Sequence, residues 1–272
     1  MATEDKSIFR QSNFTLGDGT RGTVTGSGPP LLLLHGVGLD HHMWQAQVHR
    51  FAQSHAVICY DLLGHGESPK ISSAAVIGDF VAQLARVVVE LGLPSAVVAG
   101  FSFGGIIARE FAARYGDKIK KLVLLSTVYE RSDAEREAVI GRWEKARSEG
   151  PRAIYPAALE RWFSPAFLAG QKEFVQQLLR SMMRNDDASF LRAYEIFARS
   201  DTETQFSLDA IRCPTLIVTG ERDSGSTPAM AWRMASEIAN SRVSIIPSGR
   251  HMIPLEMAPE VNRELSRFIN GE

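Results

Sequence analysis

Cysteine is scarce in this sequence, with only two among 272 residues. Cys59 and Cys213 lie in separate apolar segments, so we expect two buried thiols in a reducing compartment and no disulfide. No apolar run approaches the ~20 residues that a membrane-spanning helix requires. The N-terminal segment Met1–Lys6 lacks the basic and then apolar pattern of a secretory signal. We therefore expect a cytoplasmic protein that does not associate with membranes.

A surplus of charge is also missing, because 30 Lys and Arg residues against 31 Asp and Glu residues give a formal net charge of −1. Without a basic run, nucleic-acid binding is not expected. Residues 17–22 fit G-x-G-x-x-G, but they lie between two expected strands and open no helix, which argues against a dinucleotide site. The His41-His42 pair lacks partners at metal-ligand spacing. We expect neither a metal nor a cofactor.

What the sequence does contain is a regular alternation of buried strands and helices. Continuous apolar runs, typical of strands buried on both faces, occur at 31–34, 56–60, 96–99 and 122–125. Apolar residues at helical spacing lie between them, over 73–91 and 106–113. This alternation predicts an α/β fold, a mostly parallel twisted sheet with helices on both faces.

The alternation stops at Thr127, and strand-like sequence resumes at 214–219. We interpret residues 129–207, which carry helical patterns and many aromatics, as a helical lid over the C-terminal edge of the sheet. Residues 1–128 and 208–272 then form one core. The other expected elements are a hairpin over 8–26, a short helix capped by Asp40, helices over 228–239 and 259–269, and a last strand over 243–246.

The most informative segment is Gly100-Phe101-Ser102-Phe103-Gly104, which places G-x-S-x-G between an expected strand and an expected helix. A sharp turn there would expose the serine hydroxyl at the sheet edge, at the cost of a strained backbone. Gly100 and Gly104 would allow neighbouring chain to approach closely. We predict that Ser102 is a nucleophile.

A serine hydroxyl needs a base, and the base needs a partner that fixes its tautomer. Of the seven histidines, only His251 follows Ser102, and it lies after the last expected strand. The order serine, acid, histidine then selects Asp223 as the acid. Asp61 is the rival acid, but it precedes the serine in a Gly-rich turn, where a turn-capping role is expected.

Two backbone amides are expected to form an oxyanion hole, those of Phe103 and Val37. His35 is expected to support the loop that carries Val37. For the substrate pocket we single out His35, Trp143 and Trp162, because ligand pockets favour the junction of lid and sheet.

Taken together, the motifs resemble those of the α/β-hydrolase family over nearly the whole chain. The matching segments are His35-Gly36, Asp61–Ser68, Gly100–Gly104, Gly220–Asp223, and His251 with Pro254–Glu256. Leu159–Phe167 and Val37–Asp40 with Met43-Trp44 are most similar to the 3-oxoadipate enol-lactonase group and its carboxylesterase relatives. The resemblance implies a cofactor-independent hydrolase of a small carboxylic ester or lactone, as a monomer or homodimer.

Two alternatives stay open at this point. The first keeps the triad but changes the reaction, to hydrolysis of a carbon–carbon bond in a vinylogous diketone or to a perhydrolase-like side activity. A strongly basic lid pocket would favour acidic ring-cleavage products, and Arg109, Arg161 and Arg192 are the candidates for it. The other alternative is a non-catalytic small-molecule-binding protein that has kept the fold.

Overall fold

The computed structural model describes residues 10–271. The expectation about Met1–Lys6 and the first two residues of the expected hairpin, 8 and 9, lie outside these residues. Within them, no helix is long and apolar enough to cross a membrane. Both cysteines are free thiols; Cys59 is buried and Cys213 is half-buried.

The centre of the fold is a mostly parallel eight-stranded sheet with the strand order β1-β2-β4-β3-β5-β6-β7-β8. Strands β3 to β8 run parallel, while β2 pairs antiparallel with both β1 and β4. The strands are β1 (Gln11–Thr15), β2 (Arg21–Thr25), β3 (Pro30–Leu34), β4 (Ala56–Tyr60), β5 (Ala96–Phe101), β6 (Ile119–Leu125), β7 (Thr215–Gly220) and β8 (Ser241–Ile246). The predicted α/β fold is therefore confirmed.

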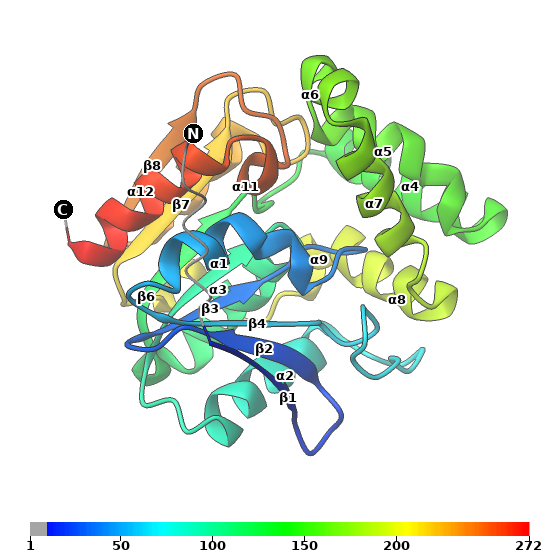
Figure 1. Cartoon of the computed structure of the whole chain (residues 1–272). Coiled ribbons are helices and arrows are strands. Elements are labelled where there is room, and N and C mark those ends of the chain that lie inside the picture. Colours follow the sequence, from blue (N-terminus) through cyan, green and yellow to red (C-terminus); the bar gives the residue numbers. More distant parts are fainter. Residues whose placement is uncertain (1–9, 272) are drawn as a thin grey trace, which may run out of the picture.

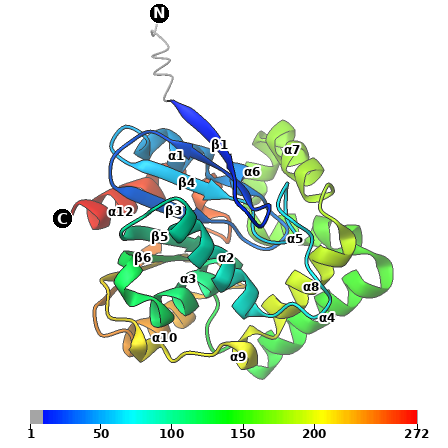
Figure 2. The same ribbon diagram turned by 90° about the horizontal axis from the view of Figure 1, so that it is seen from below.

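Helices cover both faces of this sheet, as Figure 2 shows with α1 and α12 on one face and α2, α3 and α10 on the other. They are α1 (Gln45–Phe51), α2 (Ile77–Glu90), α3 (Phe103–Arg114), α10 (Pro228–Glu237) and α12 (Ala258–Asn270). The chain after His251 also forms a short helix, α11 (Ile253–Glu256), which the sequence analysis did not predict. The side chain of Asp40 caps a helix N-terminus as expected, by accepting a hydrogen bond from the amide of His42. The helix that begins there is a 3₁₀ turn, His41–Trp44.

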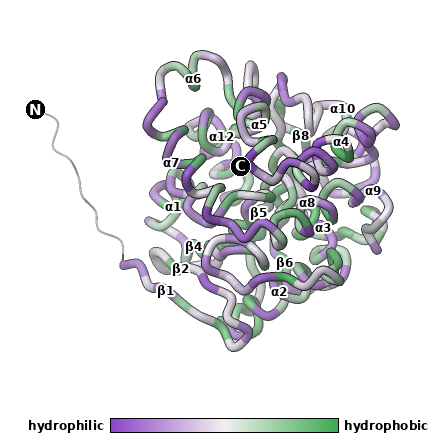
Figure 3. Tube along the Cα trace, turned by 90° about the vertical axis from the view of Figure 1, so that its right-hand side faces the viewer, coloured by the Kyte–Doolittle hydropathy of each residue, from purple (hydrophilic) through white to green (hydrophobic). Residues whose placement is uncertain are grey.

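The core lies between the sheet and its helices. Leu31 to Leu34 on β3 and Val98 to Phe101 on β5 are almost fully buried, as a central parallel strand requires. Hydrophilic residues dominate the outer helix α4 (Asp133–Glu149) in Figure 3. Burial of apolar surface at roughly 25 cal/mol per Å² is the main force that holds this arrangement together.

Between β6 and β7 the chain is helical and packs to one side of the sheet, at the right of Figure 1. The other helices there are α5 (Tyr155–Trp162), α6 (Pro165–Gly170), α7 (Lys172–Met182), α8 (Asp187–Ala198) and α9 (Ser200–Glu203). A buried ion pair of 2.7 Å between Arg131 and Asp201 ties the beginning of this segment to its end. We call residues 129–207 the lid and keep these boundaries as a proposal.

Candidate active site

The turn after β5 has the strained geometry that the sequence predicts. Ser102 has φ 53° and ψ −112°, an unfavourable conformation for a residue with a side chain. A Cβ on Gly100 would lie 2.2 Å from the carbonyl oxygen of Gly104, and one on Gly104 would lie 2.4 Å from that of Leu34. Glycine is therefore required at both positions. Its lack of a side chain lets the turn pack tightly against the chain at the beginning of α3.

Asp223 and His251 follow the neighbouring strands β7 and β8. Their side chains meet in a buried hydrogen bond of 2.8 Å between Nδ1 of the histidine and Oδ2 of the aspartate. The second carboxylate oxygen, Oδ1, accepts hydrogen bonds from the amides of Gly225 (2.8 Å) and Ser226 (2.9 Å). A carboxylate partner places the proton on Nδ1, so Nε2 of His251 is left to accept a proton.

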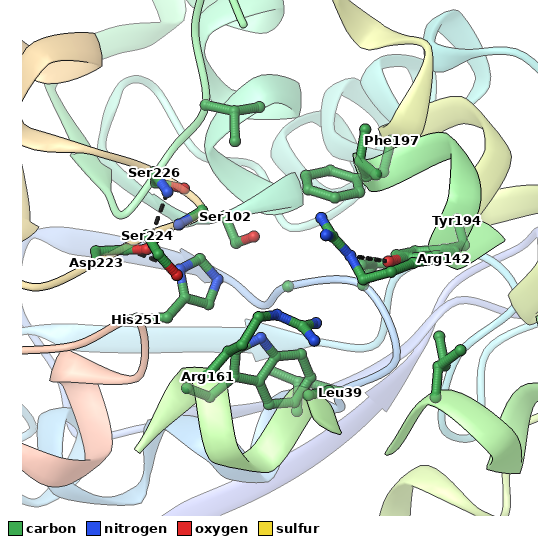
Figure 4. A pocket seen from close by; sticks show the side chains of 18 of the residues that line it. Leu39, Ser102, Arg142, Arg161, Tyr194, Phe197, Asp223, Ser224, Ser226 and His251 are labelled. Atoms are coloured by element: carbon green, nitrogen blue, oxygen red, sulfur yellow. Dashed lines mark hydrogen bonds and ion pairs between the residues drawn. The ribbon is translucent and has the colours of Figure 1, made fainter. Parts of the chain in front are cut away.

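The imidazole of His251 lies at the same end of a cavity as the hydroxyl of Ser102 (Figure 4). Its ring centroid is 5.0 Å from that of Phe101, the residue that precedes Ser102. Trp162 of the lid also lies near this ring, with its ring centroid 6.2 Å from the imidazole. The structure thus brings the three predicted triad residues together from the ends of β5, β7 and β8.

The loop after β3 carries Val37, which lines the same cavity. The next residue, Gly38, is fixed at both of its backbone polar groups: its amide donates to Nε2 of His65 (2.9 Å), and its carbonyl accepts from Nδ2 of Asn185 (2.8 Å). Phe103 is the first residue of α3, where amides have no partner within the helix. Among residues 10–271, no hydrogen-bond partner is found for the amide of Val37 or Phe103.

The structure places His35 outside the cavity, contrary to its assignment to the substrate pocket. Its imidazole is fully buried, with Nδ1 donating to the carbonyl of Gly36 (2.8 Å) and Nε2 accepting from the amide of Leu62 (2.9 Å). Burial lowers its pKa, so the ring is neutral. His35 therefore supports the loop, as expected. Asp61 caps its own turn by accepting from the amides of His41 and Glu67.

Trp143 also lies outside the cavity wall, whereas Trp162 is part of it. The indole nitrogen of Trp143 donates to the carbonyl of Leu191 (3.2 Å). The guanidinium groups of Arg147 and Arg199 stack over its ring at 5.1 and 5.4 Å. Trp143 is thus a packing residue between α4 and α8.

The cavity has a volume of about 130 Å³ and lies between the sheet edge and the lid. Its wall includes lid residues that the sequence analysis did not single out, notably Arg131, Arg142, Tyr194 and Phe197. Glu135, Ala138, Val139 and Arg142 all line the cavity and lie at the i, i+3, i+4, i+7 spacing of one face of α4. Every helix has such a face, so this spacing alone did not identify them as cavity residues.

Of the three arginines considered for a basic pocket, only Arg161 lines the cavity. Arg109 is buried elsewhere and donates to the carbonyl of Val128 (2.9 Å). Arg192 donates to the carbonyl of Ala75 through Nε (2.9 Å) and pairs with Glu195 (2.8 Å). Within the described residues, no group of three or more His, Cys, Asp or Glu side chains could hold a metal ion.

Known proteins resemble this chain over nearly its whole length. It is 31% identical to (E)-2-((N-methylformamido)methylene)succinate hydrolase of Acinetobacter baylyi, over 90% of this chain and 91% of that protein. The 3-oxoadipate enol-lactonase 2 of the same organism is 25% identical, over 86% of each chain. A thermophilic esterase from Thermogutta terrifontis superposes with a TM-score of 0.81 at 27% identity, over 96% of this chain and 98% of that chain.

The family assignment rests on sequence as well as on shape. Residues 31–264 match the alpha/beta hydrolase family, a range that includes Ser102, Asp223 and His251. The eight-stranded sheet and the covering helices have the architecture shared by the solved relatives. This chain belongs to the alpha/beta hydrolase family.

Proposed function

We propose that this protein is a serine hydrolase of a small carboxylic ester or lactone. The observation that carries the proposal is the buried 2.8 Å hydrogen bond between Asp223 and His251, beside a serine held at φ 53°. The esterase and enol-lactonase relatives support this class of bond. We further propose a cytoplasmic protein with a small-molecule substrate, as a monomer or homodimer.

In the proposed reaction, Oγ of Ser102 attacks the carbonyl carbon while Nε2 of His251 takes the hydroxyl proton. Asp223 stabilises the imidazolium that forms and keeps the proton of Nδ1 in place. The amides of Val37 and Phe103 donate to the developing oxyanion, an interaction worth roughly 3 kcal/mol for each donor. His251 then returns its proton to the leaving alkoxide, and a water molecule hydrolyses the acyl-enzyme.

The test is hydrolysis of a panel of acyl esters and small lactones by the wild-type protein and by Ser102→Ala. Hydrolysis should be lost in Ser102→Ala and retained in Ser148→Ala, because Ser148 is an exposed serine on α4. Unchanged ester hydrolysis by Ser102→Ala would contradict the proposal. Absence of turnover on every ester and lactone would favour either carbon–carbon bond hydrolysis or the non-catalytic binding protein.

Hydrolysis of a carbon–carbon bond in a vinylogous diketone is the second candidate. It is favoured by the presence of Arg161 and Arg142 in the cavity wall, since ring-cleavage products of this kind are acidic. The two reactions share the triad but differ in their leaving group, an alkoxide in one and a carbanion in the other. Turnover of a ring-cleavage diketone in preference to any ester would select this candidate.

A further inference from the structure

Two arginines of the lid face the catalytic end of the cavity. Arg142 comes from α4 and Arg161 from α5, and both line the cavity together with Ser102. In Figure 4 their guanidinium groups extend into the space opposite Ser102 and His251. The cavity therefore has a reactive end at the sheet edge and a cationic end at the lid.

Neither guanidinium pairs with a described carboxylate. Nε of Arg142 donates to the hydroxyl of Tyr194 (3.4 Å), and Nη1 of Arg161 donates to the carbonyl of Ala157 in its own helix (2.9 Å). Among the side chains that the structure describes, which leave out that of Glu203, no carboxylate forms an ion pair within 4.0 Å of either group. The nearby carboxylate of Glu135 instead accepts from the amide of Ser132 (2.7 Å) at the beginning of α4.

Arg131 provides the contrast within the same wall. Its Nη1 pairs with the carboxylate of Asp201 at 2.7 Å, and its Nη2 donates to the carbonyl of Phe197 (3.2 Å). The lid thus neutralises the arginine that holds its two ends together, whereas no described carboxylate of the lid pairs with Arg142 or Arg161. Arginines that bind an anionic ligand need guanidinium groups that are not already paired with a carboxylate, as is seen for Arg142 and Arg161 among the described side chains.

Two like charges that share a half-buried wall repel each other. Burial, and then the charge of Arg142, lower the pKa of Arg161. Arginine nevertheless stays protonated in proteins, so the repulsion persists until an anion enters. A carboxylate would fit because its two oxygens match the planar fork of N–H groups on a guanidinium.

We propose that Arg142 and Arg161 bind a carboxylate of the substrate, so that the natural substrate is an anionic ester or lactone, such as a monoester of a dicarboxylic acid. The identity of the cleaved bond rests on the proposed function, whereas the binding of the carboxylate does not. The carboxylate lies at the lid end and directs the reacting carbonyl toward Ser102.

A matched pair of esters tests this directly. Monoethyl glutarate and ethyl pentanoate have the same reacting group and nearly the same length, and they differ in a terminal carboxylate. Their kcat/KM values would be measured by proton release for the wild type, Arg142→Met, Arg161→Met and the control Arg147→Met. Arg147 lies on the same helix but outside the cavity, over Trp143.

The ratio of kcat/KM for the anionic ester to that for the neutral ester should fall at least tenfold in Arg142→Met and in Arg161→Met. It should stay unchanged in Arg147→Met, and Arg142→Lys should restore part of it. An unchanged ratio in both cavity variants would overturn the proposal. Thermal unfolding of each variant would show that the fold is retained.

Calorimetric titration of glutarate into Ser102→Ala separates binding from catalysis. We expect binding that weakens at least tenfold when Arg142→Met or Arg161→Met is added. If the wild type hydrolyses no ester but glutarate binding depends on these arginines, the proposed function fails and the carboxylate site stands. If esters are hydrolysed and glutarate binding is independent of both arginines, the carboxylate site fails.

Discussion

Asn185 of the lid donates a hydrogen bond of 2.8 Å from Nδ2 to the carbonyl of Gly38, the residue after the proposed oxyanion donor Val37. Oδ1 of the same amide group accepts from the amide of Gly66 (3.1 Å). From the other side, His65 accepts from the amide of Gly38. The loop is thus held between the lid and the core, and the position of the lid is coupled to the proposed oxyanion hole.

The first prediction concerns this coupling. Asn185→Ala removes both hydrogen bonds, and we expect kcat to fall about tenfold, the equivalent of one lost hydrogen bond of ~1.4 kcal/mol in the transition state. KM should change little, because Asn185 does not line the cavity. Steady-state kinetics on the best ester of the panel would measure both.

Two further variants define the outcome for Asn185. Asn185→Asp keeps an acceptor for Gly66 but loses the donor to Gly38, so its kcat should resemble that of Asn185→Ala. Asn13→Ala, at an exposed position on β1, should behave like the wild type. A rise in KM at constant kcat would show that Asn185 acts on substrate binding and not on the loop.

Asp223→Asn tests the role of the acid. The amide would no longer hold Nδ1 of His251 as a donor, and the wrong tautomer would leave Nε2 protonated and unable to take the serine proton. We expect kcat to fall about 10⁴-fold with the fold intact, as for the corresponding change in a serine protease. A loss of less than tenfold would identify another residue as the partner of His251.

The glycines of the nucleophile turn give a prediction for stability. Gly104→Ala would place a Cβ 2.4 Å and 2.5 Å from the carbonyl oxygens of Leu34, the last residue of β3, and His35, which follows it. We expect the free energy of unfolding to fall by at least 1–3 kcal/mol, as overpacking does. Gly141→Ala on α4 meets nothing within 4 Å, and should stabilise by about 0.5–1 kcal/mol. Urea denaturation would measure both; equal midpoints would contradict the prediction.

The buried histidines predict how stability depends on pH. Burial, reinforced by the nearby His35, lowers the pKa of His65 to about 3. The unfolded chain protonates this histidine near pH 6.5 and the folded chain does not, so stability should fall as the pH decreases from 6.5 toward 3. A single histidine contributes up to ~1.4 kcal/mol per pH unit.

His65→Gln is the variant that isolates this effect, because glutamine does not titrate and still offers an oxygen to the amide of Gly38. Its free energy of unfolding, measured with urea at pH 7, 6 and 5, should decrease less steeply than that of the wild type. The slope of the variant should not vanish, because burial also lowers the pKa of His35, which still makes stability depend on pH. Identical slopes for the two proteins would contradict the prediction.

The sheet and the three triad candidates could be located from sequence because strand ends are fixed by topology. Ser102, Asp223 and His251 follow strands whose carboxyl ends meet at one edge, so their proximity did not depend on knowing any side-chain direction. The G-x-S-x-G turn even predicted a strained serine, as its φ of 53° confirms.

The lid was less predictable because its helices are placed by packing and not by a repeating topology. Trp143 faces α8 although Arg142, its neighbour in sequence, faces the cavity, and composition alone does not distinguish them. His35 was wrongly assigned to the pocket because the side chain of a histidine at a strand end can hydrogen-bond backbone groups of the neighbouring loops as readily as it can point into a pocket. The hydrogen bond from Asn185 to Gly38 joins residues 147 positions apart, so it had no local signal.

The most direct test of the central claim is covalent labelling of the protein with a fluorophosphonate, followed by peptide mass spectrometry. We predict one adduct per chain, on Ser102, together with complete loss of ester hydrolysis. Ser102→Ala should remain unlabelled, and His251→Ala should react far more slowly. Labelling of a different serine, or full ester hydrolysis by a protein labelled at Ser102, would contradict the account.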